Sequence, residues 1–186
     1  MLYSREAALY TCKANRGKNV PITTTPLTPH VGAEITGVDS EDLVDPDAAT
    51  ACLDALDRHG VVVYPEIDIS DDDLVAFSQL LGEVVPNPTG EHRHREIATI
   101  TLDPAKTDAT LAWYRQGNFL WHIDGMTDEL PQRASLLSAH KVDPAGGDTE
   151  FANTYAAHDA LPEDRQEQIA GLRVVHSFAA AQRRSG

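Results

Sequence analysis

The pattern of apolar residues changes near residue 95, and this change limits the folds that the chain can adopt. Before residue 95, two stretches with apolar residues at helical spacing flank one short apolar run. After it, short apolar stretches alternate with turns that contain Gly and Pro, as in barrels and jelly rolls. We therefore predict an α+β fold with helices packed outside a barrel or jelly roll. The expected strands are residues 96–102, 111–115, 118–124, 133–142 and 172–178, and later helices are expected near residues 155–161 and 162–172.

The first predicted helix covers residues 45–60, where Ala49, Cys52 and Leu56 recur at helical spacing. A glycine ends this stretch, as is common at helix C-termini. The next run, residues 61–65, is short and apolar and suits a buried strand. We therefore expect a helix followed directly by a strand.

The second predicted helix covers residues 70–82 and has a clear start signal. Ser70 stands at the N-cap position with Asp73 three residues later, a pair that is similar to a capping box. The apolar stripe of this helix comprises Leu74, Phe77, Leu80 and Leu81. These features predict a helix that packs one face on a core.

The charge balance of the chain limits its partners. It carries 15 Lys and Arg against 29 Asp and Glu, a net charge of −14. Such an acidic chain repels phosphate backbones and anionic lipid surfaces. We therefore expect no nucleic acid and no membrane partner, and we expect a small molecule as the substrate. The sequence leaves a homo-oligomer open.

Length and cysteine content indicate one domain in a reducing compartment. No apolar run approaches the roughly 20 residues of a transmembrane helix, and the N-terminus lacks the apolar centre of a signal peptide. Cys12 and Cys52 are the only cysteines and lie far apart, which suits a cytoplasmic protein. A length of 186 residues fits one domain. We expect a poorly patterned lead-in over residues 1–21 and the domain over residues 22–186.

The segment around His122 carries the strongest chemical signal. In a strand, residues two apart point to the same face, so His122 and Asp124 would aim an imidazole nitrogen and a carboxylate oxygen at one point. Ile123 would point the other way, into apolar packing. One histidine and one carboxylate are two of the three ligands of the facial triad that binds non-haem Fe(II).

The triplet alone leaves other interpretations open. His122 could pack in a core while Asp124 caps a turn, because such triplets occur by chance. His92 and His94 form a second spaced pair, and cupin metal sites use such pairs. A cupin-like binding or isomerase module would use His92, His94 and His122. Cupin sites also have a glutamate several residues after the pair, whereas Glu96 here follows it at once. A solvated loop or site lid therefore fits this spacing better.

Several further motifs resemble the taurine dioxygenase and chlorophenoxyacetate dioxygenase family, the TauD/TfdA group. The family has a Trp-His-x-Asp segment, a strand of small and apolar residues, a Gly-Gly-Asp-Thr turn and an Ala-rich helix, in that order. The matching segments here are Trp121–Asp124, Ala134–Ala139, Gly146–Thr149 and Ala156–Leu161. Earlier segments agree in the same order, so the resemblance covers about residues 22–182. It implies a double-stranded β-helix, a jelly roll with a cupin-like core and flanking helices.

The resemblance also implies an activity and its site. The family hydroxylates small organic acids, namely sulfonates, sulfate esters or carboxylates, with Fe(II), 2-oxoglutarate and O₂, and releases succinate and CO₂. His122 and Asp124 match the first two iron ligands, and Thr149 matches the threonine that binds the distal carboxylate of 2-oxoglutarate. Asn118 matches an asparagine near the substrate. Asn87 stands where taurine-specific members have a substrate-contacting histidine, which argues against taurine itself.

Two family residues have no match in this sequence. The resemblance implies a third iron ligand, a distal histidine downstream of the Gly-Gly-Asp-Thr turn, and an arginine that pairs with 2-oxoglutarate. We expect His140, His158 and His176 to be packing or surface residues rather than substitutes. The chain is therefore expected to be C-terminally truncated, with an incomplete jelly roll, weak iron binding and no turnover by itself. An inactive fragment that keeps the first half of the fold is the alternative.

Overall fold

The computed structural model describes residues 22–86, 92–101, 103, 121–142, 144–177 and 179. These residues belong to two units, which are described separately here. The first unit contains the described residues up to 84 together with residues 133–172. The second contains those from 85 to 132 and from 173 onward. All the helices and strands discussed below lie in the first unit.

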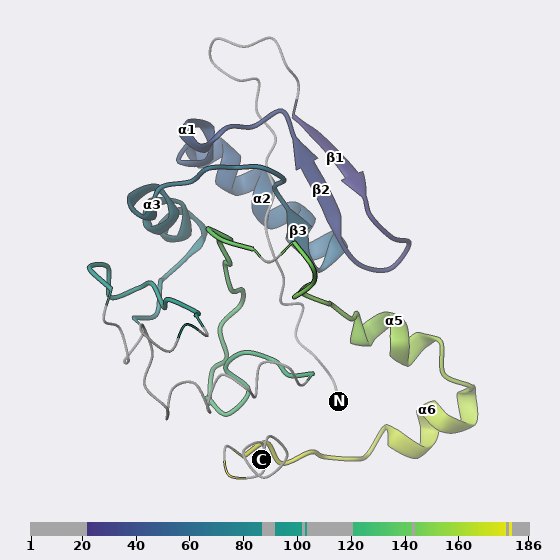
Figure 1. The fold of residues 1–186 in the computed structure, drawn as a ribbon. Coiled ribbons are helices and arrows are strands. Elements are labelled where there is room, and N and C mark those ends of the chain that lie inside the picture. The colour runs from purple at the N-terminus through teal and green to yellow at the C-terminus, as the bar shows by residue number, and fades with distance from the viewer. Residues whose placement is uncertain are drawn as a thin grey trace. The chain divides into compact units, whose positions relative to one another are not determined.

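The elements of the first unit are shown as ribbons in Figure 1. In chain order they are β1 (Thr23–Pro26), β2 (Ala33–Thr36), α1 (Ser40–Leu43), α2 (Pro46–His59), β3 (Val62–Val63), α3 (Asp71–Leu81), α5 (Thr154–Asp159) and α6 (Glu163–Ile169). Helices α1, α2 and α3 gather on one side of the small sheet (Figure 1). The first unit is thus a small sheet covered by helices, with two short helices after residue 150.

The sheet has three strands in the order β1, β2, β3. Strands β1 and β2 form an antiparallel hairpin, with Thr23 opposite Thr36 and Pro26 opposite Ala33. Strand β3 pairs with β2 in parallel, and Ala33 lies opposite Val62. Because α2 forms the connection from β2 to β3, the helix packs back onto the sheet, as parallel pairs require. The strand at residues 61–65 is thereby confirmed in a shorter form, whereas the hairpin was not predicted.

Helix α2 confirms the first predicted helix within one residue at each end. Its buried face combines the small side chains of Ala49, Cys52 and Ala55, each no more than 2% exposed, with Leu56, which is 1% exposed. Gly60 follows the helix with φ of +72°, and its N–H donates to the carbonyl of Leu56 at 3.1 Å. Glycine adopts this left-handed conformation without steric cost, so it ends the helix and lets the chain turn into β3.

Helix α3 confirms the predicted start at Ser70. The Asp73 backbone N–H donates to Ser70 Oγ at 3.1 Å, and the Ser70 hydroxyl donates to Asp73 Oδ2 at 2.6 Å. This arrangement satisfies one of the free N–H groups of the first turn. Phe77 is 1% exposed, whereas Leu80 is 37% exposed, so fewer residues of the apolar stripe are buried toward the end of the helix.

One apolar cluster holds these elements together. It contains side chains from β2, α1, α2, β3 and α3 that are each less than a tenth exposed. Its buried members are Ile35, Leu43, Ala49, Ala51, Cys52, Ala55, Val62, Ile69 and Phe77. Leu136, from the chain after the predicted metal motif, packs against the same cluster. The fold of residues 22–86 therefore has its own core, and the later segment joins it from outside.

The strands expected after residue 95 have no hydrogen-bonded ladder in the part of the chain that the structure describes. Residues 111–115 lie outside that part. Residues 134–139 still alternate strictly between half-buried and exposed positions, with Leu136 on the core and Leu137 65% exposed. That alternation is strand-like, although these residues belong to no sheet among the described residues. The described residues thus show a small sheet with helices and no jelly-roll core.

The two later helices are confirmed, with shifts of a few residues at their ends. Helix α5 begins after Asn153, and helix α6 begins after Pro162. None of the residues in either helix is buried. The longest described helix, α2, has 14 residues, and no helix in the described ranges is long and apolar enough to cross a membrane.

Replacing Phe77 by Ala is expected to lower the free energy of unfolding by about 3–5 kcal/mol, because it leaves a cavity in the core cluster. Urea denaturation followed by circular dichroism measures this change. Gln79→Ala, at an exposed position two residues away on α3, is the control and should stay within about 0.5 kcal/mol of the unaltered chain. Equal losses in the two variants would contradict the proposed core.

Candidate metal centre

His122 and Asp124 point their side chains at one another. His122 Nε2 lies 3.4 Å from Asp124 Oδ1, and the two side chains are 49% and 56% exposed. Ile123 between them is less exposed than either neighbour. This matches the alternation expected of an extended chain, in which residues two apart share a face. His122 is therefore not a packed core histidine.

The distance between these two donor atoms fits a shared metal ion. First-row ions hold nitrogen and oxygen donors at about 2.1 Å, so two donors on one ion lie at most about 4.2 Å apart. The observed 3.4 Å falls inside that limit. An imidazole nitrogen and a carboxylate oxygen are also the donor types of a facial triad. The pair thus fits two of the three protein positions of such a site.

Gly125 lets the chain turn away directly after Asp124. Its φ is +68°, a conformation that favours glycine, and the Asp128 N–H donates to its carbonyl at 2.9 Å. A Cβ at this position would collide with the side chain of Gln132. The Gln132 side chain could move aside, so the turn depends on glycine mainly for its backbone conformation.

No group of three or more metal-binding side chains occurs among the residues that the structure describes. His92, His94 and His122 are all described, so the cupin-like alternative built on them is not supported. His92 and His94 instead stack on each other, with ring centroids 5.8 Å apart, and His92 Nδ1 accepts the His94 backbone N–H at 3.2 Å. That bond uses the Nδ1 lone pair of His92, so only Nε2 of this ring is left to bind a metal.

Thr149 follows a turn that only glycine forms easily. Gly146 and Gly147 have φ of +149° and +84°, although a Cβ at either position would meet no atom within 4 Å. Backbone conformation rather than space therefore requires glycine at these positions. Thr149 is exposed and belongs to the first unit, whereas His122 and Asp124 belong to the second. The expected proximity of Thr149 to the pair stays a prediction, and Asn87 and Asn118 lie outside the described residues.

Two of the histidines considered as substitutes, His140 and His158, make polar contacts with side chains of the first unit. His140 Nε2 lies 3.8 Å from Asp71 Oδ1 and 3.5 Å from Ser138 Oγ. His158 Nδ1 lies 3.4 Å from the carboxylate of its neighbour Asp159. Each of these histidine side chains is more than two-fifths exposed. The structure therefore gives both a surface role.

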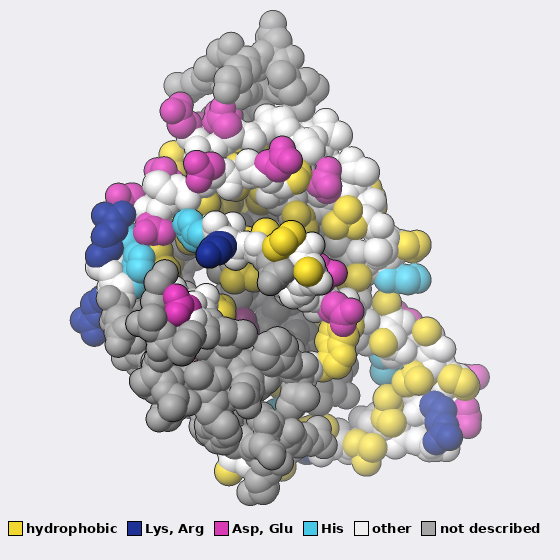
Figure 2. Space-filling model, viewed as in Figure 1, with side chains coloured by type: hydrophobic (Ala, Val, Ile, Leu, Met, Phe, Trp, Pro, Cys, Tyr) yellow, Lys and Arg dark blue, Asp and Glu magenta, His cyan; other side chains and the backbone are white. Residues whose placement is uncertain are grey.

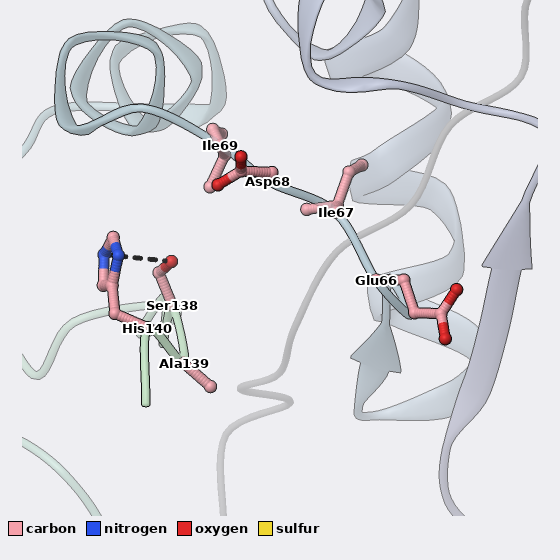
Figure 3. Close-up of a pocket in the computed structure, with 7 residues that line it drawn as sticks. All are labelled: Glu66, Ile67, Asp68, Ile69, Ser138, Ala139 and His140. Atoms are coloured by element: carbon pink, nitrogen blue, oxygen red, sulfur yellow. Dashed lines mark hydrogen bonds between the residues drawn. The ribbon is translucent and has the colours of Figure 1, made fainter. Parts of the chain in front are cut away.

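A shallow cavity of about 250 Å³ lies beside His140 in the first unit, between residues 66–69 and 138–140. Figure 3 shows the His140 ring and the Ser138 hydroxyl turned toward each other on one wall, with Asp68 on the other. Ser138 and Asp71 both approach the same ring nitrogen of His140. A nucleophile relay needs one partner on each ring nitrogen, so this arrangement is not a catalytic triad.

Long-range contacts that the sequence did not reveal hold residues 133–140 against the helices. Arg133 forms an ion pair with Asp57 of α2 at 3.2 Å, and His140 approaches Asp71 of α3. Both pairs are substantially exposed, so each adds little stability. Their partners are 76 and 69 residues apart in sequence, and no local pattern marks such pairs. Their effect is to fix where this segment lies on the first unit.

Acidic side chains are spread over the described part of the visible face (Figure 2). The first turn of α3 carries Asp71, Asp72 and Asp73, and that of α1 carries Glu41 and Asp42. Negative charge near a helix N-terminus interacts favourably with the helix dipole. Part of the negative charge thus stabilises helix starts.

Known proteins resemble most of this chain. The model of the taurine catabolism dioxygenase TauD, TfdA family matches residues 23–185. An alpha-ketoglutarate-dependent 2,4-dichlorophenoxyacetate dioxygenase from Cupriavidus pinatubonensis is 32% identical over 162 residues, which are 81% of this chain and 56% of that protein. An alpha-ketoglutarate-dependent sulfate ester dioxygenase from Pseudomonas putida is 32% identical over 153 residues, which are 82% of this chain and 48% of that protein.

One solved structure also has a similar fold. The crystal structure of AAD-2 in complex with Mn(II) and N-oxalylglycine has a TM-score of 0.70 and 29% identity, and it covers 89% of this chain and 56% of that chain. This chain spans about half the length of the curated relatives that it matches. Because the family model matches nearly all of the described residues, the chain belongs to the taurine catabolism dioxygenase TauD, TfdA family.

Proposed function

We propose that the protein is an Fe(II)- and 2-oxoglutarate-dependent oxygenase that hydroxylates a small organic acid and releases succinate and CO₂. The observation that carries this proposal is the 3.4 Å approach of His122 Nε2 to Asp124 Oδ1 in a member of this family. Relatives named for an aryloxyacetate and for sulfate esters support a carboxylate, sulfate ester or sulfonate as the substrate. The alternative is a fragment that keeps this half of the fold without activity.

His122 and Asp124 would hold the iron. To bind iron through Nε2, His122 would present the lone pair of that nitrogen and carry its ring proton on Nδ1. Asp124 contributes a carboxylate oxygen, which offsets part of the charge of the ion. When bound, Fe(II) with 2-oxoglutarate supplies the oxidising power for hydroxylation. Ile123, turned the other way, keeps the two donors on one face of the chain.

Thr149 would bind the co-substrate. Its hydroxyl is a hydrogen-bond donor of the right size for the distal carboxylate of 2-oxoglutarate. The glycines before it set the direction of the chain at that point. Asn118 and Asn87 remain the substrate-contacting candidates, on the family resemblance alone. An asparagine amide can both donate to an acidic substrate and accept from a hydroxyl.

The activity is tested by measuring substrate-dependent succinate release from the protein that carries this chain, supplied with Fe(II), 2-oxoglutarate and O₂. Sulfonates, alkyl sulfates and aryloxyacetates form the substrate panel. We expect release with at least one of these classes and none when 2-oxoglutarate is left out. No release with any class, from a folded protein that binds metal, would favour the inactive fragment.

Replacing Asp124 by Ala is expected to weaken Mn(II) binding by more than about tenfold, because loss of even an outer-shell partner costs about 10–100-fold. Mn(II) prefers similar donors and is measured directly by electron paramagnetic resonance. Asp128→Ala removes a nearby exposed carboxylate and is the matched control, expected to bind normally. If the double variant His92→Ala/His94→Ala lost Mn(II) binding while Asp124→Ala kept it, the metal site would be one made of histidines alone.

Replacing Thr149 by Val keeps the shape of the side chain and removes its hydroxyl. A hydrogen bond to a charged group contributes about 1.5–3 kcal/mol, so we expect binding of 2-oxoglutarate to weaken about 10–100-fold. Thr149→Ser retains the hydroxyl and should bind within about threefold of the unaltered protein. Isothermal titration with Mn(II) present measures both. Equal binding by the Val and Ser variants would remove Thr149 from the site.

A further inference from the structure

The side-chain amide of Asn153 joins two parts of the first unit that are far apart in sequence. Its Oδ1 accepts the backbone N–H groups of Tyr155 and Ala156 at 3.0 and 3.2 Å, and so caps helix α5. Its Nδ2 donates to the backbone carbonyl of His30 at 2.7 Å, across 123 residues. Two donors on one side and a carbonyl on the other fix the orientation of the amide.

His30 lies in a rigid turn between β1 and β2. The Thr28 hydroxyl donates to the Val31 carbonyl at 2.6 Å. The same oxygen accepts the N–H groups of Val31 and His30 at 2.9 and 3.3 Å. The Leu27 N–H closes the turn by donating to the Gly32 carbonyl at 2.9 Å. The Thr28 hydroxyl thus forms hydrogen bonds with three backbone groups. These bonds stabilise the turn to which Asn153 is bound.

This turn is also joined to the core of the first unit. The Gly32 N–H donates to the carbonyl of His59, the last residue of α2, at 2.8 Å. The next N–H, that of Ala33, donates to the carbonyl of Val61 at 2.9 Å. The hairpin turn therefore moves with α2 and β3.

Thr149 lies four residues before Asn153, in an exposed stretch without helix or strand. Packing therefore does little to hold Thr149 in place. Four residues of chain span at most about 14 Å, so an anchor at Asn153 limits how far Thr149 moves. An anchored segment loses less conformational freedom when a ligand binds, and the ligand binds more tightly.

We propose that Asn153 is a positioning residue, which tethers the segment bearing Thr149 to the β1–β2 turn and so preorganises binding of 2-oxoglutarate. The inference rests on the proposed function of Thr149. Asn153 itself would contact no ligand. Its donor Nδ2 forms the tether and its acceptor Oδ1 forms the helix cap. A substitution that changes only one of these atoms therefore tests the two contacts separately.

Asn153→Asp removes the tether and keeps the cap. A carboxylate accepts from Tyr155 and Ala156 as well as the amide does, and its charge is favourable at a helix N-terminus. It cannot donate to the His30 carbonyl. Ala157→Glu adds the same charge at an exposed position of α5 and is the matched control. Thr28→Ala loosens the turn instead and should reproduce the effect of Asn153→Asp.

The first measurement needs no ligand. Backbone order parameters from ¹⁵N relaxation are about 0.85 for rigid residues and below about 0.6 for flexible ones. In Asn153→Asp we expect the value at Thr149 to fall while those of Tyr155 to Asp159 remain unchanged. Ala157→Glu should leave Thr149 as in the unaltered chain. An unchanged value at Thr149 in Asn153→Asp overturns the proposal.

The second measurement is the Kd for N-oxalylglycine in the presence of Mn(II). If the competent arrangement of Thr149 falls to about 10–20% of the population, the Kd rises about 5–10-fold. Thr28→Ala combined with Asn153→Asp should weaken binding no more than either change alone, because both break one tether. In the protein with turnover, the KM for 2-oxoglutarate should rise with kcat nearly unchanged.

The outcomes separate this inference from the proposed function. If Thr149→Val weakens binding of N-oxalylglycine and Asn153→Asp does not, Thr149 keeps its role and the tether is overturned. If Thr149→Val has no effect, or the unaltered chain binds no N-oxalylglycine, the role of Thr149 is overturned. Asn153 then loses its positioning role as well, whatever the order parameters show.

Discussion

The close packing of α2 against the sheet and α3 is the constraint on which the rest of the first unit depends. Ala49, Cys52 and Ala55 are almost completely buried, and small side chains of this kind let the backbone of the helix approach its neighbours closely. Phe77 fills the space that remains. The core lies within residues 22–86 apart from Leu136, and polar contacts such as Arg133–Asp57 and Asn153–His30 join the later described residues of the first unit to the earlier ones.

The polar contacts differ in what they contribute to the first unit. The Arg133–Asp57 pair is exposed on both sides and contributes little to stability, yet it fixes the start of the segment that carries Leu136. The Asn153 amide contacts a backbone carbonyl in a turn that is itself fixed. Such contacts help to place residues 133–172 within the first unit, whereas the apolar core determines whether the unit folds. The stability of the first unit and the placement of its later segment therefore depend on different residues.

The sequence predicted the features that depend on near neighbours. Helices α2 and α3 followed from apolar spacing and from Ser70, and the convergence of His122 on Asp124 followed from the two-residue repeat of an extended chain. The β1–β2 hairpin escaped prediction because β1 is a polar, fully exposed Thr-rich strand. The strands expected after residue 95 form no hydrogen-bonded ladder among the described residues, since alternation sets which side of a segment is buried but not which strand pairs with it. The contact between Asn153 and His30 joins residues too far apart for any local pattern.

The exposure of His122 and Asp124 has a consequence for metal identity. About half of each side chain is exposed, so the pair by itself offers little selection of an ion by size. Two such donors follow the general order of affinity for divalent ions, in which Ni²⁺ and Cu²⁺ bind more tightly than Fe²⁺. Protein purified on a nickel resin would then carry Ni²⁺ from the resin. Its metal content would record handling rather than biological preference.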